Sequence, residues 1–275
     1  MPMEKVAVMT DTISGISREV AEQYGVAVVP LQVVLDGVSY PDTGVDKDRL
    51  YELLAGRRQL PTTSAATAAR YLETYRRLSE QADAIVHVCY TSWIGMGYKE
   101  ALQAVSVARR ELPNTSIEAV DTRTEHGAQL LCVLEAAKAV AGGKGFREVV
   151  AAVHSLVPKL NQLYVLDTPF YLARGGRMGT AGSWAKTGIG VKPILELDWS
   201  TGGAMSPVTR ARTKARALEK ALAIFKHRNG PRKAHVVISH DDAPDDAQTL
   251  KEQILKQAPA SEVRIAGVSP VTIVH

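Results

Sequence analysis

Apolar and polar residues follow two different periods along this chain. Short runs of apolar, mostly β-branched residues predict β-strands in the first half of the sequence, at 6–9, 26–35, 85–90 and 117–120. Longer segments repeat an apolar residue every three or four positions and predict helices, at 17–24, 47–55, 65–81, 98–111, 124–141 and 146–160. Strands that alternate with helices are typical of a parallel sheet covered by crossover helices. The first half is therefore expected to be a three-layer α/β/α domain.

The pattern changes beyond residue 160. Strand-like segments at 162–166, 193–197 and 205–209 follow each other closely, with glycine-rich turns between them. Further helices are expected at 212–227 and 246–257, and further strands at 234–239, 262–265 and 271–274. This order predicts an α+β second domain with a mixed sheet. A chain of 275 residues suits two domains, and we divide it into an N-terminal domain, 1–158, and a C-terminal domain, 159–275.

The composition is that of an ordinary globular protein, with 45% hydrophobic and 23% charged residues. No stretch approaches the ~20 consecutive apolar residues that span a bilayer, and no secretory signal precedes the first strand. A cytoplasmic protein is expected. Cys89 and Cys132 lie among apolar neighbours, where a thiol usually packs as a small hydrophobic group, so no disulfide is predicted.

The charge balance bears on possible partners. The 33 basic and 29 acidic residues leave a net charge of +4, which favours mild attraction to anions. Basic residues concentrate at Arg210, Arg212, Lys214, Arg216 and Lys220, at roughly helical spacing, as either a solvated helix face or a surface for an acidic partner. Binding to nucleic acid is not expected, because no recognition motif accompanies the charge and only 5% of residues are aromatic.

Hydroxyl-bearing or acidic turns follow three of the predicted strands, at residues 10–12, 91–92 and 121–122. In open parallel sheets, ligands bind outside the carboxyl ends of the strands, so these turns are expected to meet at one crevice. Each turn has a second interpretation, because Ser, Thr and Asp are also preferred helix N-caps.

A cluster of three hydroxyls, Thr62, Thr63 and Ser64, directly precedes a helix that is predicted to begin near Ala65. A helix N-terminus presents unpaired amides and the positive end of the helix dipole, so this segment suits a carboxylate or a phosphate. One hydroxyl is needed simply to cap the helix. Three in a row exceed that need and make ligand contact a second interpretation.

The loop 174–177 places two guanidinium groups, Arg174 and Arg177, around two glycines. Arginine can grip an oxyanion with two parallel hydrogen bonds, and glycine permits a close approach of the backbone. The alternatives are a tight turn with two solvated arginines or a contact with a partner protein.

Signals of catalysis and of metal binding are missing from the sequence. The seven histidines form no recognisable metal spacing with Cys, Asp or Glu, and the chain has neither a G-x-S-x-G turn nor a Walker loop. We therefore expect no metal, no cofactor, and a binding protein rather than an enzyme.

Five segments, in their order along the chain, resemble motifs of the DegV family of bacterial fatty-acid-binding proteins. Residues 8–12, VMTDT, resemble V-T-D-S-[ST], and residues 24–31, YGVAVVPL, resemble Y-G-I-x-V-V-P-L. Residues 61–64, PTTS, match P-x-T-S; residues 172–177, LARGGR, match L-x-[KR]-G-G-R; and residues 191–195, VKPIL, are similar to I-K-P-I-L. Each motif is short, but their joint order is specific and covers essentially the whole chain.

The resemblance implies two α/β lobes with a long-chain fatty acid between them. Thr63 and Ser64 would bind the carboxylate, and the loop that contains Arg174 would lie near the carboxylate or on the surface that faces a partner. In this family the protein is the acyl-carrying subunit of a fatty acid kinase, whose separate catalytic subunit phosphorylates the bound acid for phospholipid synthesis. The chain is then expected to be a monomeric cytoplasmic carrier with transient contact to the membrane surface, and not the catalyst.

Two positions depart from the family pattern. Where the family reads S-S-x-L-S-G-T-Y, residues 91–98 read TSWIGMGY, so Gly95 replaces a serine that is expected to touch the carboxylate. Ser92 or a water molecule would then substitute for it. The chain stops at His275, which matches the histidine of the family's C-terminal motif and is a further candidate ligand.

A rival hypothesis keeps the fold and changes the function. In it the chain is an enzyme or a sensor that acts on a small acidic or phosphorylated metabolite, with Asp11, Asp121 and Arg174 around the same crevice. A polar, closed crevice without an apolar channel would favour this rival.

Overall fold

The main sheet of the protein has four strands, all parallel. The structure is a computed structural model that describes residues 4–56, 60–178 and 190–274. Its main sheet has the strand order β2 (Ala27–Val29), β1 (Val6–Asp11), β6 (Ala84–Cys89) and β7 (Ser116–Asp121). Because the chain must cross over to begin each parallel strand at the same edge, helices lie between the strands in sequence. The predicted parallel sheet of the N-terminal half is confirmed.

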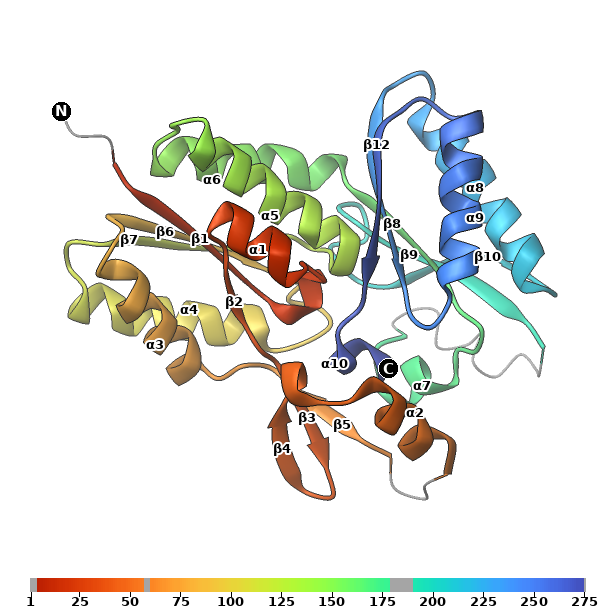
Figure 1. The fold of residues 1–275 in the computed structure, drawn as a ribbon, viewed down its shortest axis with the longest axis horizontal. Helices are drawn as coiled ribbons and strands as arrows, with labels where there is room; N and C mark the ends of the chain where they lie inside the picture. The colour runs from red at the N-terminus through yellow and green to blue at the C-terminus, as the bar shows by residue number, and fades with distance from the viewer. Residues whose placement is uncertain (1–3, 57–59, 179–189, 275) are drawn as a thin grey trace.

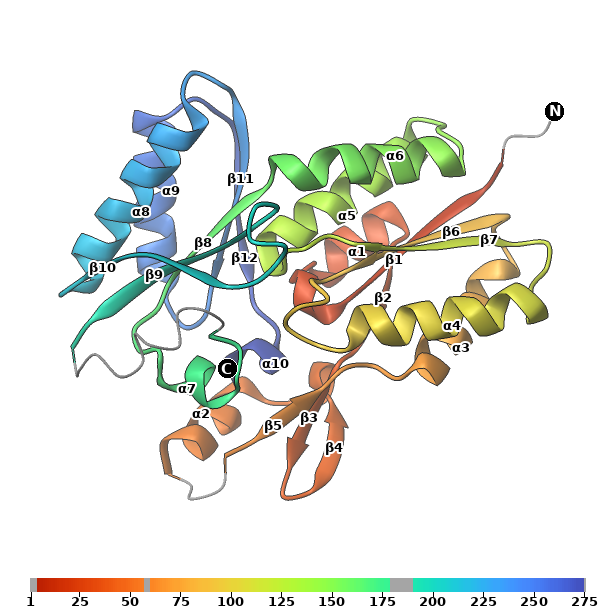
Figure 2. The same cartoon turned by 180° about the vertical axis from the view of Figure 1, so that it is seen from behind.

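Neighbouring residues of each strand pack against opposite helix layers, as strand geometry requires. Val8 and Val86 belong to one apolar cluster with α5 (His126–Ala141) and α6 (Phe146–Leu156), whereas Met9 and Ile85 belong to another with α3 (Ala68–Ser79) and α4 (Gly97–Glu111). Figure 1 and Figure 2 show α5 and α6 above the sheet and α3 and α4 below it, with the short α1 (Arg18–Tyr24) on the upper side. The predicted three-layer arrangement is therefore present.

The predicted strand 26–35 is two strands that belong to different sheets. β2 pairs with β1, whereas β3 (Gln32–Leu35) pairs with β4 (Val38–Pro41) and β5 (Thr62–Ser64) in an antiparallel sheet. Pro30 lies between them and has no N–H to continue the first ladder. The next amide, that of Leu31, donates to Thr12 Oγ1 (3.1 Å). This second sheet and α2 (Lys47–Gly56) form a small unit below the main sheet (Figure 1).

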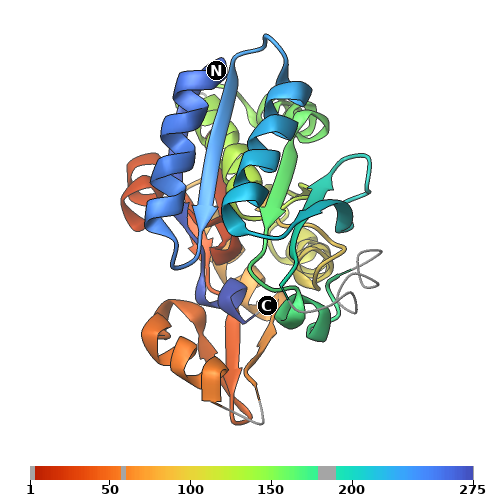
Figure 3. The same cartoon turned by 90° about the vertical axis from the view of Figure 1, so that its right-hand side faces the viewer.

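The described part of the C-terminal half, 160–178 and 190–274, contains two further sheets and two long helices. One sheet is antiparallel, and the other is a parallel pair, so the mixed strand directions that the sequence predicts are present. Figure 3 shows both long helices on the outer side of these strands. The elements are β8 (Asn161–Val165), β9 (Lys192–Asp198), β10 (Ser206–Ala211), α8 (Lys214–Asn229), β11 (Ala234–His240), α9 (Pro244–Gln257) and β12 (Ala260–Gly267).

The final predicted strand, 271–274, is wrong, because this segment is the short helix α10 (Pro270–Ile273). Pro270 occupies the first helical position, where its fixed φ suits a helix and its missing N–H is not needed. The apolar side chains that suggested a strand pack in a cluster with Leu31, Val33 and Leu50 of the small unit. The end of the chain thus returns to the N-terminal half.

Proline also shortens the helix that was predicted over 146–160. α6 ends at Leu156, and a 3-10 turn follows over Val157–Lys159. Pro158 cannot donate the hydrogen bond that would extend an α-helix. Cys89 and Cys132 are both buried, as their apolar neighbours predict, and are free thiols. Throughout the three described ranges, no helix is long and apolar enough to cross a bilayer.

The basic run at 210–220 is divided between two elements and does not form a single helix face. Arg210 belongs to β10, and α8 begins only at Lys214. Lys214 Nζ forms ion pairs with Asp167 Oδ2 (3.2 Å) and Asp246 Oδ2 (2.8 Å). Part of the charge is therefore neutralised within the molecule.

Candidate functional site

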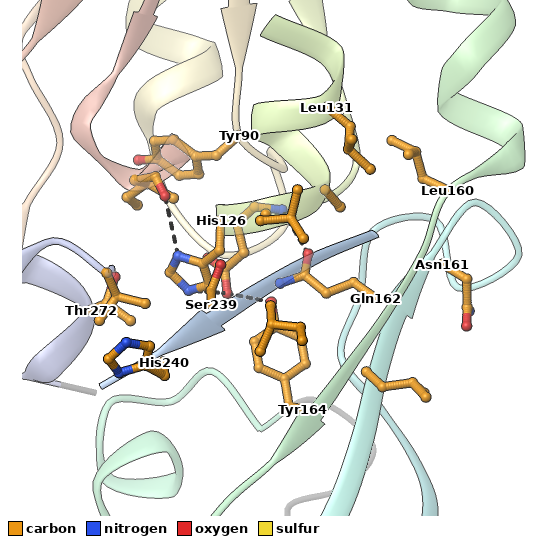
Figure 4. Close-up of a pocket in the computed structure, with 18 of the residues that line it drawn as sticks. Tyr90, His126, Leu131, Leu160, Asn161, Gln162, Tyr164, Ser239, His240 and Thr272 are labelled. Atoms are coloured by element: carbon orange, nitrogen blue, oxygen red, sulfur yellow. Dashed lines mark hydrogen bonds and ion pairs between the residues drawn. The ribbon is translucent and has the colours of Figure 1, made fainter. Parts of the chain in front are cut away.

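A large cavity opens between the carboxyl ends of the main sheet and the C-terminal half. Its volume is about 1780 Å³, more than the roughly 300–1,000 Å³ of common ligand sites. Figure 4 shows Tyr90 and Thr272 on one side, Leu131 and Leu160 on the other, and His126 between them. The two sides differ in chemistry. We call the first the polar end, which comprises Thr63, Ser64, Tyr90, Ser92 and Gly95.

Thr63 and Ser64 reach the cavity from a strand and not from a helix N-terminus. They belong to β5, where Thr63 pairs with Val33 and is half-buried. The helix that follows begins only at Ala68, so the predicted start near Ala65 is wrong. The amide of Ala68 donates to Glu100 Oε2 (2.7 Å). Because a carboxylate of the chain itself already occupies this helix end, the helix dipole gives no argument for an anion at Thr63 and Ser64.

The hydrogen bond between Ala68 and Glu100 also links the two segments that form the polar end, β5 and the loop before α4. Glu100 belongs to α4, so its bond to Ala68 fixes the start of α3, just beyond β5, against the start of α4. The loop before α4 contributes Ser92 and Gly95 to the cavity wall. Four of the residues selected from the sequence, Thr63, Ser64, Ser92 and Gly95, therefore line one cavity.

Hydrogen bonds to neighbouring residues fix the loop between β6 and α4. The hydroxyl of Thr91 donates to the carbonyl of Gly203 (2.9 Å) and accepts from the amide of Trp93 (3.2 Å). The amide of Ser92 donates to Asp121 Oδ1 (3.3 Å). Thr91 and Asp121 thus hold the loop in place, and the side chain of Ser92 is exposed at the cavity wall.

The two arginines of the glycine loop have different positions. Arg177 is half-buried, lines the cavity and donates to the carbonyl of Gly175. Arg174 is exposed at the end of α7 (Phe170–Arg174) and is not part of the cavity lining. His275 lies outside the described residues.

The middle of the cavity contains a buried ionisable pair that the sequence did not reveal. Glu125 Oε1 accepts a hydrogen bond from Tyr164 Oη (2.6 Å) and lies 3.2 Å from His126 Nε2. His126 Nδ1 lies 3.2 Å from the carbonyl oxygen of Ile13. Burial alone would lower the pKa of His126, but the Glu125 carboxylate and the Ile13 carbonyl together raise it above its usual value. The pair thus places an imidazole and a carboxylate in contact with each other inside the cavity.

Apolar side chains gather on the opposite side of the cavity, which we call the apolar end; charged residues of the same helices, Lys138 of α5 and Arg228 of α8, also belong to the lining. The apolar side chains come from both halves of the chain: α5 and the segment of β8 on one side, and α8 and β11 on the other. They are Leu131, Leu134, Leu160, Leu163, Leu222, Phe225 and Val236. Such a surface favours methylene groups, each of which gains roughly 0.8 kcal/mol on leaving water.

The acidic residues of the rival enzyme hypothesis do not reach the cavity. Asp11 is fully buried; its Oδ1 accepts from the amide of Ile13 (3.1 Å) and from Gln129 Nε2 (3.4 Å). Burial raises the pKa of Asp11 to about 7. Neither Asp11 nor Asp121 is part of the lining. Within the described ranges, no three His, Cys, Asp or Glu side chains are grouped so as to hold a metal ion.

A deep cavity with hydroxyls at one end and leucines at the other is typical of a protein that binds an amphipathic ligand. Residues 5–275 match the DegV family, which is described as a family of uncharacterised proteins. A DegV domain-containing protein of Clostridium perfringens is 30% identical over 254 residues, which cover 90% of this chain and 89% of the relative. Another, of Streptomyces coelicolor, is 30% identical over 273 residues, or 98% of this chain and 94% of the relative. The chain belongs to the DegV family.

Solved structures of other proteins share the fold. A fatty-acid-binding DegV family protein from Thermus thermophilus superposes with a TM-score of 0.90 at 24% identity, over 98% of this chain and 95% of the other. A stearic acid-binding protein from Eubacterium ventriosum gives a TM-score of 0.89 at 20% identity, over 98% and 94% of the two chains. At these identities the likeness establishes the fold.

Proposed function

We propose that this protein binds a long-chain fatty acid, with the carboxylate at the polar end of the cavity and the acyl chain at the apolar end. The observation that carries the proposal is the single cavity in which these two surfaces meet. Several related structures of the same fold are fatty-acid-binding proteins, which agrees with it.

The polar end offers hydrogen-bond donors suited to a carboxylate. The hydroxyls of Thr63, Ser64 and Ser92 line the wall, and the guanidinium of Arg177 adds a positive charge. Hydrogen bonds to an ionised acceptor are stronger than those between neutral groups. Three hydroxyls and one guanidinium therefore suit a carboxylate head group.

The apolar end presents more apolar surface than a small metabolite can cover. A phosphorylated or acidic metabolite has no methylene chain to cover seven leucine, phenylalanine and valine side chains, and the acids named for the enzyme hypothesis lie outside the lining. Both observations favour a carrier of a lipid acid over that alternative.

We further propose that the bound acid is presented in the cytoplasm to a separate kinase subunit that forms the acyl phosphate, as the sequence resemblance implies. In this proposal the protein is a monomer of two lobes, 1–158 and 159–275, that meets the membrane surface only transiently. Purified protein loaded with oleate, ATP and the fatty acid kinase subunit of the same organism should produce acyl phosphate. No product above that of kinase with free oleate would contradict this part.

Lipid extraction tests the binding itself. Protein purified from cells should release a long-chain fatty acid detectable by mass spectrometry, and oleate added to delipidated protein should raise its melting temperature, because a ligand that binds only the folded state stabilises it. Repeated preparations without fatty acid, together with an unchanged melting temperature, would refute the proposal.

A further inference from the structure

Tyr90 fills the space that two glycines leave open at the polar end. It directly follows β6, is only 2% exposed, and lines the cavity. A Cβ atom at Gly95 would lie 2.8 Å from the Tyr90 hydroxyl oxygen, and a Cβ atom at Gly97 would lie 2.5 Å from the ring. Both distances are below any normal contact. The phenol therefore fits here only because residues 95 and 97 have no side chain.

Among the described residues, the hydroxyl oxygen of Tyr90 has one hydrogen bond, in which it is the acceptor. The amide of Gly97, the first residue of α4, donates to it (3.0 Å), and the N-cap residue Met96 supplies no side-chain cap. Tyr90 thus accepts from an amide that the helix itself leaves unpaired. No described residue accepts a hydrogen bond from the phenolic hydroxyl.

The hydroxyl keeps its proton at neutral pH. Burial, and then the nearby carboxyl group of Asp11, hold the pKa of Tyr90 well above its usual value. A neutral phenol whose oxygen accepts an amide N–H is a polarised donor, because hydrogen bonds in a chain strengthen one another. A buried donor without an acceptor is unfavourable until a ligand supplies one.

The geometry points to Tyr90 as a ligand-binding residue: its hydroxyl donates to the carboxylate of the bound lipid acid, at the wall position where Gly95 has no side chain. This assignment rests on the proposed function. It accounts for Gly95, because the phenolic hydroxyl stands 2.8 Å from where the Cβ of a serine at this position would be. Tyr90, Gly95 and Gly97 then act together as one head-group contact.

The test compares a free acid with its ester. Wild type and Tyr90→Phe are titrated with oleate and with methyl oleate, which has the same chain but no ionised carboxylate. Loss of a hydrogen bond to a charged group should weaken oleate binding by roughly 10-fold or more and leave methyl oleate within about 2-fold. Tyr98→Phe is the matched control, because Tyr98 lies on α4 outside the cavity lining.

Two further variants keep the test decisive if the buried phenylalanine impairs folding. Gly95→Ala retains the tyrosine but displaces its hydroxyl, so it should reduce the preference for oleate over methyl oleate. Tyr90→Ala should reduce that preference about as much as Tyr90→Phe does, and adding Gly95→Ser to it should restore part, because the vacated space admits the serine.

Equal losses for oleate and methyl oleate in Tyr90→Phe would show a purely structural role and overturn the assignment. An unchanged preference in both Tyr90→Phe and Gly95→Ala would also overturn it, while oleate binding by wild type would leave the proposed function intact. If wild type binds neither probe, the proposed function fails, and the Tyr90 assignment fails with it.

Discussion

The two ends of the cavity are built in different ways. The polar end is made of a short strand and loops, and its donors are few: the hydroxyls of Thr63, Ser64, Tyr90 and Ser92. The apolar end is formed largely by helices and strands whose side chains also belong to the protein core, such as Leu222. In the proposed function, recognition at the polar end depends on individual atoms, whereas binding at the apolar end is spread over many contacts. Single substitutions should therefore act differently at the two ends.

The largest effect is expected from a charge at the apolar end. Leu131→Glu would place a carboxylate where the acyl chain lies, and an unpaired charge in an apolar site costs several kcal/mol. Oleate affinity should fall by at least roughly 100-fold, as measured by isothermal titration calorimetry. Leu102→Glu, at an exposed leucine of α4 outside the cavity, is the control and should bind as wild type. Equal affinities of the two variants would show that the acyl chain lies elsewhere.

A smaller loss is expected at the polar end. Thr63→Ala removes one donor to the carboxylate and should weaken oleate binding by about 1–3 kcal/mol, the usual cost of leaving a charged group without its hydrogen bond. Thr62→Ala alters the neighbouring residue of the same strand, which is exposed and does not line the cavity. Competition with a fluorescent fatty acid compares the oleate affinities of the two variants. Identical competition curves would show that Thr63 does not contact the carboxylate.

A still smaller difference in oleate affinity is expected between Arg177→Ala and Arg174→Ala. Arg177→Ala removes a positive charge from the cavity wall, and partial exposure screens that charge, so a loss of about 0.5–1 kcal/mol in oleate binding is expected. Arg174→Ala, at the exposed end of α7, should leave binding unchanged. The contrast should shrink at high salt. The opposite ranking would mean that Arg174 supplies the charge.

The smallest effect on binding is expected at Asp11, which is buried outside the cavity lining. Substitution of Asp11 should instead change the stability of the folded protein. The Asp11 pKa of about 7 exceeds that of the unfolded chain, so folding takes up a proton and stability falls as the pH rises from about 4 through 7. Asp11→Asn removes this loss, on the order of 1–3 kcal/mol. The melting temperature of the variant relative to wild type should rise by roughly 2–6 °C between pH 5 and pH 8.

Scanning fluorimetry between pH 5 and pH 8 measures this change in melting temperature. The control Asp48→Asn changes an exposed carboxylate of α2 and should give a curve parallel to that of wild type. Parallel curves for Asp11→Asn as well would mean that Asp11 is ionised in the folded protein.

Hydrophobic periodicity predicted the main sheet well, because its strands contain apolar runs, and β6 is buried along its whole length. Within the small unit it predicted α2 but missed β4 (Val38–Pro41), whose four residues are all exposed, so that no alternation marks the strand. It also misassigned α10, where β-branched residues suggested a strand and the proline that starts a helix was the better signal. The division between residues 158 and 159 stays a prediction.

The candidate site was predicted in part, and for one wrong reason. Sequence motifs led to Thr63 and Ser64, but the expected helix N-terminus is occupied by Glu100. Glu125 and Tyr90 were missed, because their surroundings depend on contacts that no local pattern contains. The bond from Tyr164 to Glu125 joins residues 39 apart in sequence.

The contact of Tyr90 with two glycines also restricts the order in which these positions can change during evolution. A serine at 95 meets the phenol as long as the tyrosine is present, and any side chain at 97 meets its ring. The path that avoids both contacts gains the glycines before the tyrosine and regains a serine at 95 only after the tyrosine is lost. If Tyr90 binds the carboxylate as proposed, each intermediate on that path carries one carboxylate donor fewer and has weaker ligand affinity.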